Sequence, residues 1–176
     1  MPPVVQKPSS EAPTNTTIGN SPTDHWGDLR RPLAVVGNGQ PCDVATGRHL
    51  SDKFAPGFGN GPAYAVGGDR ASFVDDPTAR DDRGRFPVKV LWVADGRFAG
   101  LVLVRGFAVE DGTRIQFSGP ALDELRIDWR GSASEDWREW ASATFVTGPG
   151  CYSWQVDTAD GSDVITFEVR ASAKQY

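Results

Sequence analysis

Short segments in which apolar and polar residues alternate constrain this chain more than any other feature. In residues 124–129, for example, Leu125 and Ile127 would point to one side of an extended strand and Arg126 to the other. Nowhere does a 3.6-residue apolar period persist for ten residues, as an amphipathic helix would require. Asp-Gly pairs, which favour tight hairpins, separate several segments and occur at 95–96, 111–112 and 160–161. The pattern predicts antiparallel strands and little helix.

Two packed antiparallel sheets satisfy these patterns best. Half-polar strands suit a sheet with one solvated face, whereas the unbroken apolar run 101–104 predicts a central strand covered on both faces. The expected fold class is therefore all-β, an antiparallel two-sheet β-sandwich of Ig-like architecture that is not a true immunoglobulin domain. One helical turn is expected in residues 133–140. Three tryptophans in alternating strands are expected in the core: Trp92, Trp129 and Trp154.

Length and composition predict one domain with an appendage. Residues 1–24 are rich in Pro, Ser and Thr, with few core-forming side chains, and we expect a disordered linker there. Residues 25–176 then form a single β-sandwich domain. The net charge of -5 argues against a nucleic-acid partner, which would need clustered Lys and Arg. No apolar run is long enough for a transmembrane span.

The two cysteines, Cys42 and Cys151, allow two interpretations. They could be buried free thiols of a cytosolic protein, or a disulfide in an exported one. The start of the chain has the composition of a segment that follows a removed signal peptide, and lysines are few, so we favour a secreted or cell-surface tethered protein with a disulfide. If Tyr152 and Trp154 face the core, Cys151 points outward. Either its partner approaches from outside the sandwich, or a bulge turns Cys151 inward; we expect the segment around Cys42 to cross the sheet from outside.

Candidate ligand-binding residues lie in a polar stretch that contains two tryptophans. Trp137 and Trp140 could stack on sugar rings, with Arg138 and Glu139 hydrogen-bonding to hydroxyls. In the alternative interpretation, these two rings cap one end of the core or cover the last hairpin. The sequence has no nucleophile, zinc or phosphate-binding motif, so no catalytic residue is assigned.

A calcium site is a weaker possibility in an acidic stretch. Oxygen ligands of the kind that calcium prefers are supplied there by Asp75, Asp76, Asp81 and Asp82. The order of these residues does not match an EF-hand, and a solvated loop is the alternative interpretation. No other cofactor is expected.

Several strings, taken in order, resemble an uncharacterised family of bacterial exported or lipid-anchored proteins. They are "RPL…PC", "GNGPAYAV", "KVLWV", "GLVLVRG", "IQFSGPALDELRI", "WREWASATFV" and "PGCYSWQVD…VITFEV". The resemblance spans about residues 31 to 170. It implies an exported β-sandwich with a bridge between Cys42 and Cys151, and it brings no known activity, cofactor or catalytic residue.

The sequence thus leaves three functions open. The first is a non-catalytic exported binding or structural module whose partner, a glycan or a protein, is unknown. The second is a carbohydrate-binding module that uses exposed tryptophans. The third is a hydrolase whose loop carboxylates assemble into a site.

Overall fold

The all-β fold class is confirmed by the computed structural model, which describes residues 25–34, 41–119, 123–131 and 136–172. Within these ranges the only helices are α1 (His25–Leu29) and η1 (Pro77–Ala79). Neither has the length or the apolar character that a helical membrane crossing requires. The strands are β1 (Gly57–Phe58), β2 (Ala63–Val66), β3 (Ser72–Asp75), β4 (Phe86–Ala94), β5 (Leu101–Ala108), β6 (Arg114–Phe117), β7 (Leu125–Asp128), β8 (Arg138–Val146), β9 (Gly150–Thr158) and β10 (Gly161–Ala171).

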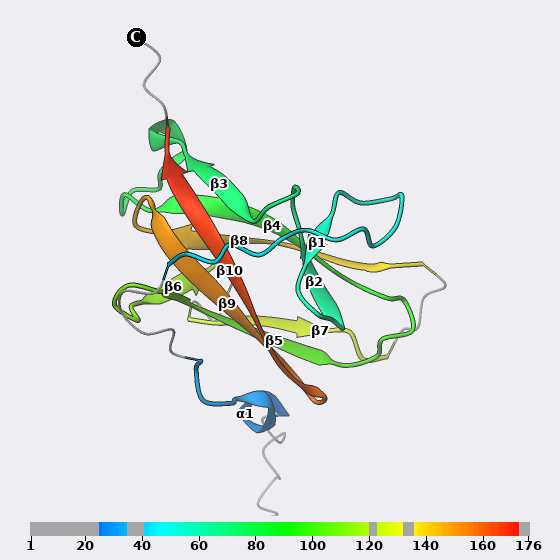
Figure 1. Ribbon diagram of the computed structural model, residues 1–176. Coiled ribbons are helices and arrows are strands. Elements are labelled where there is room, and N and C mark those ends of the chain that lie inside the picture. The colour runs from blue at the N-terminus through cyan, green and yellow to red at the C-terminus, as the bar shows by residue number, and fades with distance from the viewer. Residues whose placement is uncertain (1–24, 35–40, 120–122, 132–135, 173–176) are drawn as a thin grey trace, which may run out of the picture.

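The strands belong to one curled, mixed sheet, whereas the sequence predicts two separate antiparallel sheets. Their order is β1-β2-β4-β8-β6-β5-β9-β10-β3, and β7 pairs with β5 off this path. Short β6 joins the two halves, because Ile115 pairs with Gly106 of β5 while Phe117 pairs with Thr144 of β8. The sheet is mixed because β3 lies parallel to β10. Figure 1 shows β9 and β10 crossing in front of β4 and β8.

The curl brings the inner faces of the two halves together and forms the core between them. Trp92 of β4 and Trp154 of β9 meet edge to face, with ring centroids 5.6 Å apart. The buried indole nitrogen of Trp154 donates a hydrogen bond of 3.0 Å to Oγ1 of Thr144 on β8. Trp129 is also buried, so the predicted core positions of all three tryptophans are confirmed.

Strand β5 is the centre of one half of the sheet. It pairs with β9 along one edge. Along the other edge, Leu101 to Val104 pair with β7, and Gly106 and Phe107 pair with β6. Val102, Leu103 and Val104 are inaccessible to solvent although they point to alternate faces. The absence of alternation in this run therefore predicts correctly a strand that is covered on both sides.

Some local expectations are wrong. A helical turn is predicted in residues 133–140, of which 133–135 lie outside the described ranges. Residues 136–140 are not helical, because Arg138 to Trp140 begin strand β8; a nine-residue pairing with β4 overrides the weak helix signals there. Strand β3 lies in a segment whose sequence does not predict a strand. The apolar residues 32–36 do predict one, but residues 32–34, the described part of that segment, have no regular secondary structure. The predicted linker, residues 1–24, lies outside the described ranges.

Candidate functional site

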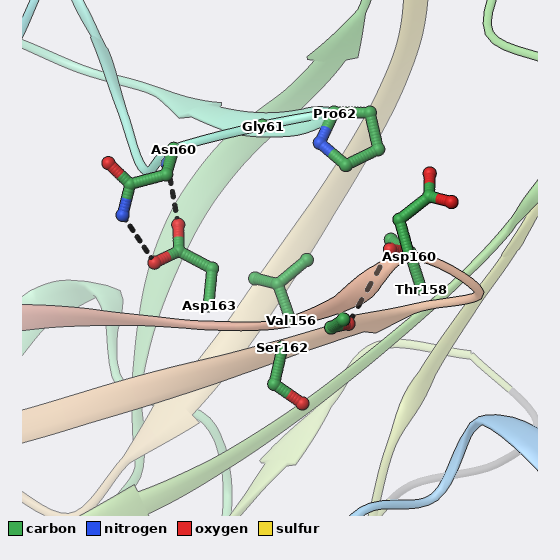
Figure 2. Close-up of a pocket in the computed structure, with 9 residues that line it drawn as sticks. Asn60, Gly61, Pro62, Val156, Thr158, Asp160, Ser162 and Asp163 are labelled. Carbon is green, nitrogen blue, oxygen red and sulfur yellow. Dashed lines mark hydrogen bonds between the residues drawn. The ribbon is translucent and has the colours of Figure 1, made fainter.

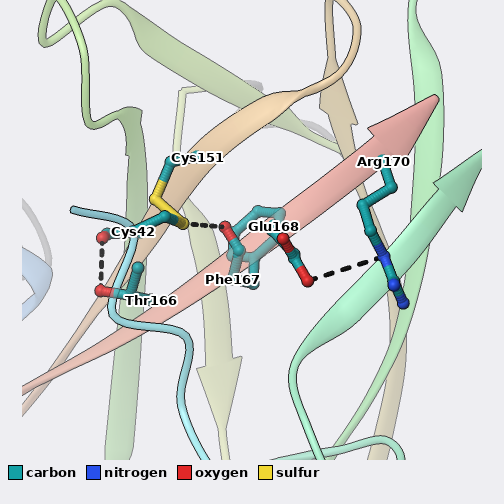
Figure 3. The surroundings of a disulfide bond; sticks show 7 residues. Cys42, Cys151, Thr166, Phe167, Glu168 and Arg170 are labelled. Atoms are coloured by element: carbon teal, nitrogen blue, oxygen red, sulfur yellow. Dashed lines mark hydrogen bonds and ion pairs between the residues drawn. A yellow bond between two sulfur atoms is a disulfide. The ribbon is translucent and has the colours of Figure 1, made fainter.

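An N-terminal strap, residues 25–34 and 41–46, crosses the outer face of the sheet over β5, β9 and β10. A disulfide joins Cys42 to Cys151, with Cα atoms 5.7 Å apart, and so ties the strap to β9. Three residues further along, the amide of Ala45 donates to the carbonyl oxygen of Thr166 on β10. Figure 3 shows Cys42 reaching Cys151 from the strap side. The predicted bridge, and the crossing from outside the sheet, are both present.

The strap covers a stripe of polar side chains on the outer face of β9. Ser153 and Gln155 are buried there although they point away from the core. The Gln155 side-chain amide binds the strap backbone: its Oε1 accepts from the Ala34 amide at 2.7 Å, and its Nε2 donates to the Pro32 carbonyl at 3.1 Å. The Gln155 side chain thus forms hydrogen bonds with the Pro32 carbonyl and the Ala34 amide, as the backbone of a neighbouring strand would.

A buried ion pair lies beneath the same strap. Arg105 of β5 and Asp157 of β9 contact each other with 5% and 0% exposure, and Nη2 of Arg105 also donates to the Arg31 carbonyl oxygen. Oδ1 of Asp157 accepts from Nε2 of Gln155 at 2.9 Å and from the Ser162 hydroxyl. The charges are therefore compensated by each other and by hydrogen bonds, as a buried pair requires.

A second ionic cluster fixes the first residues of the strap. Nη2 of Arg30 contacts both carboxylate oxygens of Glu124 at 2.8 Å, and Nε of Arg126 donates to Oε1 at 2.6 Å. Burial alone would raise the pKa of Glu124, but the hydrogen bonds and charges of the two arginines outweigh it and lower the pKa below its usual value. Trp26 in α1 lies beside Arg126, whose guanidinium carbon is 5.7 Å from the ring centroid.

Of the four predicted ligand-binding residues, Arg138, Glu139 and Trp140 lie in β8, and Trp137 directly precedes it. Trp137 packs edge to face against Phe54, with centroids 5.6 Å apart, and Glu139 forms an ion pair of 3.1 Å with Lys53. Trp140 instead pairs in register with Trp92, so it lies on the inner side of the strand. Alternation places Arg138 on that same side. Trp137 and Trp140 therefore do not form one flat platform.

On the inner side, the two residues differ in exposure. Trp140 is 40% exposed, whereas Arg138 is only 7% exposed. Nε of Arg138 donates to the Gly96 carbonyl oxygen at 3.2 Å, and Nη2 is buried without a hydrogen-bond partner among the described residues. β6 pairs with β8 only at Thr144 and Phe145, so no described strand pairs with that edge of β8 beside Trp140.

The acidic loop uses its carboxylates locally. Asp75 forms a buried ion pair with Arg80, and Asp76 caps η1 by accepting from the Thr78 amide at 2.9 Å. Asp81 accepts from Nε of Arg85 at 2.8 Å. Within the ranges that the structure describes, no group of three potential metal ligands includes Asp75, Asp76, Asp81 or Asp82. Calcium binding there stays a prediction.

A small polar pocket, with a volume of about 170 Å³, opens beside the turn between β9 and β10. Figure 2 shows the Asp163 carboxylate held on one wall, where Asn60 donates to it from its backbone at 2.6 Å and from its side chain at 2.9 Å. Pro62 and Val156 supply apolar surface, and Asp160 lies at the other side. Nothing in the sequence indicates this pocket, because its walls come from segments about 100 residues apart.

Several surface aspartates are held in the ionised form by their neighbours. Hydrogen bonds from arginine or threonine side chains, or from backbone amides, lower the pKa of Asp76, Asp81, Asp95, Asp111 and Asp128. A general acid needs the opposite, a carboxyl whose pKa is raised towards neutrality. These groups therefore behave as parts of turns and surface ion pairs.

The fold and its contacts define an all-β protein whose curled sheet is covered by a disulfide-tied strap. No protein-family model and no curated protein matches the chain. The resemblance to bacterial exported proteins thus stays a prediction.

Proposed function

We propose that the chain is an exported, non-catalytic binding module. The observation that carries this proposal is the Cys42–Cys151 disulfide, which ties the strap across the sheet. Such bonds persist in oxidising compartments and are rare in the cytosol. The buried charged groups Arg105 and Asp157 are occupied with each other beneath the strap, which favours a rigid scaffold over a catalytic centre.

The test is location and oxidation state in intact source cells. We expect the chain to be digested by a protease added outside the cells, and to react with a thiol-specific alkylating reagent only after reduction. A cytosolic control protein should resist the protease in the same sample. The proposal would be overturned if the chain resisted the protease as the cytosolic control does, and if both of its cysteines were alkylated before reduction.

A second candidate, glycan binding, is favoured by the exposure of Trp140. The Trp140 ring is flat and 40% exposed, and no strand in the described ranges pairs with the nearby edge of β8, so the ring is available for stacking on a sugar. Titration of tryptophan fluorescence with a panel of oligosaccharides tests this candidate. Binding should be lost in Trp140→Ala and retained in Trp137→Phe, since Trp137 is already packed on Phe54.

A further inference from the structure

Two arginines of this protein are almost equally buried but are compensated very differently. Arg105 is 5% exposed and pairs with the Asp157 carboxylate. Arg138 is 7% exposed, and within the described part of the chain its guanidinium makes one hydrogen bond, from Nε to the Gly96 carbonyl. A buried guanidinium without an anion is costly, because its desolvation is not offset by an opposite charge. Arg138 therefore stands out as a buried cation without a counter-ion among the described residues.

The surroundings of Arg138 do not supply that counter-ion from the described residues. Glu139, the adjacent carboxylate, points to the other face of β8 and is bound by Lys53 at 3.1 Å. Nη2 of Arg138 has no hydrogen-bond partner in these ranges. Nε of Arg105 is also buried without a hydrogen-bond partner within the same ranges, but that guanidinium has the Asp157 carboxylate beside it. Arg138 has no such carboxylate among the described residues, and water or an external anion would satisfy it.

Trp140 lies beside Arg138 on the same face of the strand. Residues two apart in a strand are separated by about 7 Å. Trp140 is 40% exposed and Arg138 retains 7% exposure. A sugar ring stacked on Trp140 would place an attached carboxylate within range of the guanidinium. Arginine binds carboxylates with charge-assisted, often bidentate hydrogen bonds.

We propose that Arg138 and Trp140 form a subsite for a glycan that carries carboxylates, such as a chain of uronic acid units. The proposal rests on the glycan-binding candidate function and specifies its ligand class. Trp140 supplies the stacking surface and Arg138 selects the acidic sugar. An acidic peptide would satisfy Arg138 as well, but it would make no specific use of the flat ring.

The test compares a carboxylate ligand with its uncharged methyl ester. Oligogalacturonate and its methyl ester are titrated calorimetrically against the full oxidised chain. The wild type should bind the free acid about tenfold or more tightly than the ester, as expected when one hydrogen bond to a charged group is lost. Arg138→Met should abolish this preference, and Trp140→Ala should weaken binding of both ligands. Arg130→Met, which removes an exposed arginine, is the matched control and should bind like the wild type.

Thermal unfolding adds a readout that does not depend on the ligand. Without ligand, Arg138→Met should unfold at the wild-type temperature or above it, because it removes an uncompensated buried charge. Arg105→Met should unfold at a lower temperature, because it leaves Asp157 unpaired. A clear loss of stability in Arg138→Met would show that the guanidinium is structural, and would overturn the proposal.

The outcomes separate this inference from the function on which it rests. Equal binding of acid and ester, unchanged in Arg138→Met, would overturn the acidic subsite and leave glycan binding standing. No binding of any oligosaccharide would overturn both. Tight binding of polyglutamate that survives Trp140→Ala would overturn the glycan ligand and assign the surface to an acidic peptide.

Discussion

Arg105 and Asp157 form an ion pair between the outer faces of β5 and β9, and neither side chain is more than 7% exposed. The pair would face solvent if the strap did not cross it, since both residues point away from the core. Arg105 donates a hydrogen bond to the Arg31 carbonyl oxygen of the strap. Asp157 accepts one from the side-chain amide of Gln155, which itself binds the strap backbone. The strap and the ion pair therefore depend on each other.

Removal of one member of this pair should be strongly destabilising. We expect Arg105→Met to lower the free energy of unfolding by about 3–5 kcal/mol, because it leaves a buried carboxylate uncompensated. Urea denaturation followed by tryptophan fluorescence measures the loss. Arg130→Met breaks an ion pair with Asp128 that is about half exposed, and should cost only about 0–1 kcal/mol. Equal effects of the two substitutions would contradict the structural role of the buried pair.

The disulfide should contribute a large part of the stability. Cys42 and Cys151 are 109 residues apart, and a loop of about 100 residues predicts about 4–5 kcal/mol from chain entropy. The double substitution Cys42→Ser, Cys151→Ser should lower the urea midpoint of unfolding by an amount that corresponds to this free energy. Reduction of the wild-type disulfide should lower the midpoint by the same amount. Hydrogen exchange at the Ala34 amide, which donates to Gln155, should accelerate more than exchange in β5. Equal acceleration at both places would mean that the strap does not loosen separately.

Acidification should loosen the attachment of α1 and the first strap residues. The pKa of Glu124 is lowered in the folded protein, so its contribution to stability is complete above the pKa of the unfolded chain. That contribution is lost as the pH falls from about 4.3 through the lower folded value. In Glu124→Gln, stability should be lower at neutral pH and less dependent on pH in this acidic window. An unchanged slope would show that Glu124 is not linked to folding.

Two buried indole nitrogens offer a matched comparison in the core. Trp154 donates to Thr144, which is inaccessible to solvent, and Trp92 donates at 3.1 Å to Ser142, which is only partly buried. We expect Thr144→Val to cost about 1–3 kcal/mol, because the indole donor is left unsatisfied. Ser142→Ala should cost less, since water can reach the freed donor. Denaturant unfolding of both variants, with near-ultraviolet circular dichroism as a check of packing, gives the comparison.

Local patterns in the sequence predict most of the strands, but not how they join. The alternation at Leu125 and Ile127, and its absence in residues 101–104, depend only on nearby residues and indicate the correct faces. The double pairing of β6 and the parallel addition of β3 to β10 depend on the curl of the whole sheet, which no local period encodes. The sequence therefore predicts two separate sheets and does not predict that β6 joins them into one.

The candidate site could be predicted only in part for a similar reason. The sequence singles out residues 137–140 as unusual, but it suggests a helical turn that would group their side chains differently. In strand β8 successive side chains point to opposite faces, so Arg138 and Trp140 share one face and Glu139 points to the other. Trp137 directly precedes the strand. The polar stripe of β9 has a visible signal, since Ser153 and Gln155 alternate with core residues. Its burial depends on a strap more than 100 positions away.

The disulfide also determines which part of the chain can carry mechanical load. When tension is applied before Cys42 and at the end of β10, it passes from Cys42 through the sulfur atoms directly into β9. Residues 43–150 are bypassed, and only the chain before Cys42 and the hairpin of β9 and β10 lie in the path of the force. Stretching an oxidised molecule in this way would therefore not extend residues 43–150 themselves.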